Sequence, residues 1–203
     1  ALRAEVVYTE QDEAAGLVSM TSSDSGLLTL MRFAQVIQPN APSINNGQTL
    51  PIDLQMQGLN APTQTIAILL RSAGDLQTPD QVNRWNFRGF KNDTLRILTI
   101  ELIVSGGNVR TVYSATEGLY DEDQNRFNHY PLLGPVYFID FAKHATGLTK
   151  TSGHIDIAGL ANPILRVTVQ NSTGATFTPN FQLLAWTHNI ANLKQGVLSR
   201  VFQ

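Results

Sequence analysis

Apolar and polar residues alternate in short runs along this chain, and turn-forming residues separate the runs. Between Thr49 and Gln57 the apolar residues Leu50, Ile52, Leu54 and Met56 alternate with more polar neighbours. Alternation with a period of two is typical of a strand that buries one face and exposes the other. Seven further runs are candidate strands: Phe33 to Ile37, Gln64 to Leu70, Thr94 to Val104, Val109 to Thr116, Val136 to Phe141, Leu165 to Gln170 and Phe177 to Trp186. The pattern predicts an all-β fold, a single eight-stranded jelly-roll β-sandwich with long loops.

One run has a different character, because it is apolar on both faces. The sequence LRILTIELIV from Leu95 to Val104 is interrupted only by Arg96, Thr99 and Glu101. Such a run is expected in the middle of a sheet. The Gly106-Gly107-Asn108 sequence that follows predicts a tight hairpin turn.

The segment from Leu27 to Ile37 fits two kinds of structure. Leu27, Leu30, Met31 and Ala34 share a helical stripe, and Ser25 is suited to cap a short helix. The second half of the segment also fits a strand. The sequence leaves one short helix open as an alternative at this place.

The length of 203 residues fits one domain, residues 1–203, with an arm at residues 1–26 and a tail at residues 189–203. A chain of this size buries roughly 70% of the surface that its unfolded form exposes. Two connections, Arg71 to Asp93 and Glu117 to Pro135, are long for a compact sandwich. Loops of this length commonly carry contacts or function.

The composition excludes several kinds of chemistry. The chain has no cysteine, which rules out disulfides, thiolate metal sites and cysteine nucleophiles. Charged residues make up 15% of the chain, the net charge is −2, and the first 26 residues hold Arg3 as their one basic side chain. No basic arm is present to neutralise phosphates, so we expect no direct binding to a genome.

One segment combines cations with aromatic rings and is the candidate contact loop. Its residues are Arg84, Trp85, Phe87, Arg88, Phe90 and Lys91. This pattern can grip single-stranded nucleic acid or an anionic membrane surface, or it can make a contact between subunits. It also fits a loop that packs against the body with its arginine stems.

The sequence gives only weak evidence for a metal site or a catalytic site. His154, Asp156 and His188 could form a two-histidine, one-carboxylate iron site, but only 47 residues follow Asp156, too few for the barrel strands that follow such a pair in the iron and 2-oxoglutarate oxygenases. Asp121-Glu-Asp123-Gln-Asn125 resembles the first half of a calcium loop, but Arg126 replaces the required glycine. A looser cation site near Asp121 to Asn125 stays open. We expect no enzyme, no catalytic residue, no bound metal and no cofactor.

The last third of the chain carries a family resemblance. The residues concerned are Tyr137 to Phe141, Ser152-Gly153, Ile155 to Ile157, Leu165 to Val169, and the tail from Asn189-Ile190 through Gly196 to Phe202. This order of an apolar strand, a loop, a Ser-Gly step, a strand pair and a short apolar tail resembles the closing part of major capsid proteins of tailless icosahedral viruses with an internal membrane. The chain length favours the single-jelly-roll type within that lineage.

The resemblance implies a virion protein, in a bacteriophage or a related virus, that assembles into an icosahedral shell. Its expected partners are copies of itself in a trimeric or hexameric capsomer, other capsid proteins and an underlying viral membrane. The alternative is a trimeric spike or a receptor- or carbohydrate-binding sandwich, in which Trp85, Phe87, Tyr120 and Tyr130 stack on sugar rings.

Overall fold

The computed structural model describes residues 27–74, 86–89, 93–104, 107–115, 136–142, 153–194 and 197–200, with backbone only at 27–32, 198 and 200. Nine strands and no helix lie within these ranges. The strands are β1 (Leu27–Ile37), β2 (Thr49–Gln55), β3 (Thr63–Ser72), β4 (Leu95–Val104), β5 (Asn108–Ser114), β6 (Tyr137–Asp140), β7 (Ile164–Asn171), β8 (Pro179–Lys194) and β9 (Val197–Arg200). None of the described residues belongs to a helix long and apolar enough to cross a membrane.

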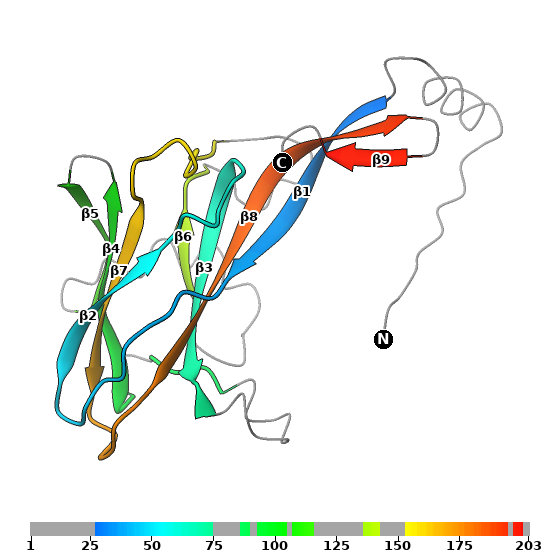
Figure 1. The fold of residues 1–203 in the computed structure, drawn as a ribbon. Helices are drawn as coiled ribbons and strands as arrows, with labels where there is room; N and C mark the ends of the chain where they lie inside the picture. The colour runs from blue at the N-terminus through cyan, green and yellow to red at the C-terminus, as the bar shows by residue number, and fades with distance from the viewer. Residues whose placement is uncertain are drawn as a thin grey trace. The chain divides into compact units, whose positions relative to one another are not determined.

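The strands form two sheets (Figure 1), one in the order β1-β8-β3-β6, with β9 also paired to β8, and the other in the order β2-β7-β4-β5. The antiparallel hairpin β4–β5 is the innermost pair, and β3–β6, β2–β7 and β1–β8 are nested successively around it. A long hairpin rolled up in this way gives a jelly roll. The predicted fold class is confirmed.

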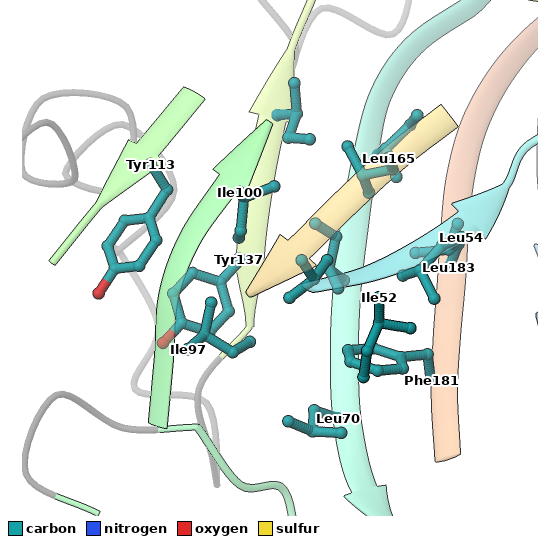
Figure 2. Close-up of a cluster of buried hydrophobic side chains, with 14 of the residues drawn as sticks. Ile52, Leu54, Leu70, Ile97, Ile100, Tyr113, Tyr137, Leu165, Phe181 and Leu183 are labelled. Atoms are coloured by element: carbon teal, nitrogen blue, oxygen red, sulfur yellow. The ribbon is translucent and has the colours of Figure 1, made fainter. Parts of the chain in front are cut away.

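The core lies between the two sheets and follows from the alternation in the sequence. Figure 2 shows Ile52 and Leu54 of β2 facing Phe181 and Leu183 of β8. All four side chains are at most 2% exposed. Because successive side chains of a strand point to opposite faces, each predicted run contributes every second residue to this interior.

Two local predictions about β4 are confirmed. β4 lies between β7 and β5, as expected of a run that is apolar on both faces. β4 and β5 form an antiparallel hairpin in which Val104 pairs with Asn108. Gly107 has a φ of 77°, a conformation that glycine adopts without steric cost.

The helix considered for Leu27 to Ile37 is wrong, because this segment is β1. Phe33, Gln35 and Ile37 are half-buried whereas Ala34 and Val36 are exposed, so the side chains follow a period of two. Pairing with β8 supplies the backbone hydrogen bonds that a helix would have made internally. The helical stripe is overridden by this long-range pairing.

Strands β1 to β8 each overlap one predicted run, and the largest differences lie at the first strand and the last: β1 begins at Leu27 rather than at Phe33. The sequence prediction ended the last strand at Trp186, but β8 continues to Lys194, and β9 was not predicted. By its internal contacts the chain divides into two compact units, Arg32–His188 and Ala1–Met31 with Asn189–Gln203. In the second unit the end of β8 pairs antiparallel with β9, with Leu193 opposite Leu198.

Candidate contact surfaces

Arg88, a residue of the candidate contact loop, is tied to the body of the protein. Its backbone N–H donates to the carbonyl of Leu70 at the end of β3, at 2.7 Å. Its guanidinium donates to both carboxylate oxygens of Asp93, each at 2.7 Å, and to the hydroxyl of Thr94 at 3.2 Å. The two-pronged pairing fixes the plane of the guanidinium as well as its distance. The structure therefore holds Arg88 in an internal ion pair.

Gly89 continues this attachment with its backbone. Its carbonyl accepts a hydrogen bond from the Tyr137 hydroxyl, and it forms a parallel bridge with Arg96. Its φ is 108°, and a Cβ built on it would lie 3.2 Å from two side-chain carbons of Ile97. An L side chain is strained at such a φ, so the close approach of this loop to the core favours glycine.

The Asp93 carboxylate accepts the hydrogen bonds that hold the Arg88–Gly89 segment next to the start of β4. Its burial acts to raise the pKa, but the hydrogen bonds from Arg88, the backbone N–H groups of Leu95 and Gly89, and the positive charge of Arg88 outweigh burial and lower the pKa to about 2. A carboxylate that accepts several hydrogen bonds is stabilised in its charged form. Asp93 is therefore ionised at neutral pH and orients the chain that enters β4.

The other residues of the candidate contact loop are only partly described. Phe87 is half-buried beside Arg88, whereas Arg84, Trp85, Phe90 and Lys91 lie outside the described residues. The contact-loop prediction stays a prediction. Its one described cation, Arg88, is committed to Asp93, a pairing that an acidic residue five positions downstream could have suggested.

The structure separates the three residues considered for an iron site by exposure. His154 and Asp156 are exposed on either side of Ile155, which bridges to Thr63, whereas His188 is buried in β8. The Asp156 carboxylate accepts a hydrogen bond from the N–H of Gly159 at 3.3 Å. Within the described ranges no group of three or more His, Asp or Glu side chains could hold a metal ion. Asp121 to Asn125 lie outside the described residues.

Asn171 makes a buried hydrogen-bond cluster that sequence reasoning missed. Its amide nitrogen donates to the carbonyls of Ile44 and Ala175, both at 2.8 Å. Its side-chain oxygen accepts from the N–H and the hydroxyl of Thr173, at 3.0 and 2.7 Å. The side chain is 0% exposed, so this amide joins the segment before β2 to the turn after β7. The Asn171-Ser172-Thr173 triplet has the pattern of a glycosylation sequon, but the side chain of Asn171 is buried.

The outward face of the β2-β7-β4-β5 sheet is polar. Arg166 donates to the two carboxylate oxygens of Asp53 at 2.7 and 3.0 Å, and the Thr99 hydroxyl donates to Thr168 at 2.9 Å. The hydrogen bonds from Arg166 lower the pKa of Asp53. This cross-strand ion pair joins two opposite charges on the surface of the sheet.

The outward face of the other sheet carries aromatic side chains. Phe138 of β6 and Trp186 of β8 have ring centroids 6.1 Å apart. On β3 between them, Phe138 lies opposite Ala67 and Trp186 lies opposite Thr65. Both rings are half-buried. The two outward faces therefore differ in chemistry, one polar and one aromatic.

Neither the family models nor the curated protein sequences give a match to this chain. The nested strand order defines the chain as a jelly-roll β-sandwich, and solved structures with the same fold come from viral capsids. The chain is similar to VP54 of PBCV-1, from a crystal structure fitted into a reconstruction of the virophage Sputnik, with a TM-score of 0.66 and 15% identity over 97% of this chain and 55% of that one. It is similar to a chain of the PBCV-1 capsid, with a TM-score of 0.57 and 16% identity over 87% of this chain and 52% of that one.

A third similar structure is the Faustovirus major capsid protein, with a TM-score of 0.54 and 13% identity over 90% of this chain and 36% of that chain. The chain thus spans about half the length, or less, of the capsid proteins that it matches. At these identities the similarity shows a common fold. The fold expected from the resemblance in the closing residues is confirmed.

Proposed function

We propose that this chain is a structural, non-enzymatic subunit of a virion, and that it self-assembles into capsomers of an icosahedral shell. The observation that carries the proposal is the likeness of 97% of the chain to the jelly roll of a viral capsid protein. Jelly rolls form the domains of many viral capsids. In this proposed role the protein acts as a structural building block through its fold.

Features of the chain itself support the proposal. On the polar sheet face Asp53 and Arg166 form an ion pair, and only 15% of the residues in the chain are charged. Such a surface repels identical neighbours weakly. In the proposed assembly the single domain has an arm at residues 1–26 and a tail at residues 189–203 that contact adjacent copies, with Arg84 to Lys91 as a further contact loop.

The proposed partners are copies of this chain in a trimer or hexamer, other capsid proteins and a viral membrane beneath the shell. Direct binding to the genome is not part of the proposal, since the first 26 residues carry one basic side chain.

The test measures how the purified chain assembles. Light scattering after size exclusion, at concentrations from about 1 to 100 μM, and negative-stain micrographs of the same samples would be compared. Hexamers, rings or sheets that grow with concentration support a shell subunit. A monomer at all concentrations, or a fixed trimer that binds a glycan array, overturns the proposal and in the second case favours a spike.

A further inference from the structure

The unit Arg32–His188 has four strands at the edges of its two sheets. β1 and β6 border one sheet, and β2 and β5 border the other. An edge strand presents a row of backbone N–H and C=O groups that can pair with a strand of another chain. Natural proteins therefore block such edges with proline, charges, bulges or short strand length.

Three of the four edges carry a blocking feature. β2 contains Pro51, which has no N–H to donate, next to the charged Asp53. β5 carries an exposed Arg110 and an irregularity in its pairing between Ile100 and Glu101 of β4. β6 is four residues long. Each of these edges is a poor template for a further strand.

The β1 edge lacks all of these features between Phe33 and Ile37. This stretch contains no charge, proline or glycine, and among the described strands β8 is the one paired with β1 (Figure 1). Ala34 is exposed and Val36 is 51% exposed. On the other face, Ile37 packs against the core and the Gln35 amide nitrogen donates to the side-chain oxygen of Asn60. The stretch is therefore held as a strand by β8 and by these inward contacts, and no second strand among the described residues pairs with it.

We propose that the β1 edge from Phe33 to Ile37 pairs antiparallel with the same edge of a second copy of this chain. A neutral stretch meets its own copy without opposing like charges. With Gln35 on the two-fold axis, Ala34 of one copy lies opposite Val36 of the other, so both exposed apolar side chains gain a neighbour. The pairing extends the β1-β8-β3-β6 sheet across the two copies.

This inference rests on the self-association in the proposed function, and it names the strand that makes one contact. An isologous contact of this kind closes on itself as a pair. A shell would then contain pairs across β1 edges in addition to its other contacts.

The experiment uses disulfide cross-linking, which suits a chain without native cysteine. Residues opposite each other in an antiparallel pair have Cα atoms roughly 4.5–5.5 Å apart, within the range for a disulfide. Ala34→Cys and Val36→Cys chains carrying different affinity tags would be mixed, allowed to associate and oxidised. Val109→Cys is the matched control, because Val109 is 55% exposed and lies on the β5 edge.

We expect the mixed Ala34→Cys and Val36→Cys cross-link to exceed the Val109→Cys cross-link by at least about fivefold. A Val36→Lys chain, which places like charges on both sides of the pair, should weaken association about tenfold. If the wild-type chain associates while the mixed cross-link is no stronger than that of Val109→Cys, the β1 inference fails and the shell proposal stands. A wild-type chain that stays monomeric overturns both.

Discussion

Replacing Asn171 by alanine tests whether one buried amide holds two distant segments together. The substitution removes four side-chain hydrogen bonds at once, two donated to the carbonyls of Ile44 and Ala175 and two accepted from Thr173. One of these bonds, to the Ile44 carbonyl, links positions 127 residues apart in the chain. The asparagine is fully buried, so water does not readily reach the groups that lose their hydrogen-bond partner. Leaving such a group without a partner costs free energy of folding.

The size of the effect follows from which groups lose their partners. The Ile44 carbonyl still accepts from the N–H of Phe177, and the Ala175 carbonyl still accepts from the Thr173 hydroxyl. The Thr173 N–H loses the partner described for it. Four bonds at a net of about 0.5–1.5 kcal/mol each, reduced because two carbonyls keep a donor, give a loss of about 3 kcal/mol in the free energy of unfolding.

Urea unfolding followed by far-UV circular dichroism, at a concentration where the chain is monomeric, measures this loss. A lowering of the melting temperature by roughly 6–12 °C corresponds to it for a domain of this size. The matched control is Asn46→Ala, which removes one exposed hydrogen bond, from the N–H of Gly174, in the same turn. This control should cost under about 1 kcal/mol.

If Asn171→Ala and Asn46→Ala lower the unfolding free energy equally, the reasoning about the buried amide is wrong. Asn171→Asp adds a second check. At neutral pH a carboxylate would face the carbonyls of Ile44 and Ala175, so this variant should be at least as destabilised as Asn171→Ala. A harmless Asn171→Asp substitution would also refute the interpretation.

Three further outcomes are expected. Because the pKa of Asp93 falls from 3.8 to about 2 on folding, its contribution is complete above about pH 5 and is lost as the pH falls through 2. Asp93→Asn should cost about 1 kcal/mol at pH 7, after allowance for solvent screening, and only a small part of that at pH 2, as urea titrations at both values would show. Gly153→Ala should lower the free energy of unfolding by about 3 kcal/mol in thermal melts, because its φ is 137° and the new Cβ would lie 2.9 Å from the carbonyl oxygen of Phe141. The control is Gly74→Ala, whose new Cβ would have its nearest contact at 3.5 Å and which should cost less than about 1 kcal/mol. Asp53→Asn should cost under about 1 kcal/mol and lose its effect in 1 M salt, since its ion pair is on the surface; an effect as large at high salt would contradict this.

The strands were predictable where side chains follow a simple alternation. In β2 and β7 every second residue enters the core, and the predicted runs match these strands within two residues at each end. The prediction ended β8 early because Thr187, His188 and Asn189 are all buried, so polar residues stand at positions where alternation predicts apolar ones. A window of sequence cannot show that a polar side chain is covered by distant parts of the chain.

The contacts that hold the loops were harder to predict than the strands. Arg88 and Asp93 were visible as charges, but their pairing depends on the turn that Gly89 makes against Ile97. Asn171 begins the sequence Asn-Ser-Thr-Gly, which is typical of a turn. Its partners nevertheless include Ile44, which no local pattern connects to it. Pairings of this kind follow from the strand order, which local periodicity does not determine.

The nested pairing of the strands also has a consequence for synthesis on the ribosome. Among the described strands β2 has β7 as its neighbour, so Thr49–Gln55 cannot form this pairing until Ile164–Asn171 has been translated, and β1 waits still longer for β8. At about 5–20 residues per second, the nascent chain carries unpaired strands for several seconds or more. Such a chain is exposed to aggregation through its strand edges during that interval, so its yield in cells should depend on chaperone supply and translation speed as well as on the stability of the finished sandwich.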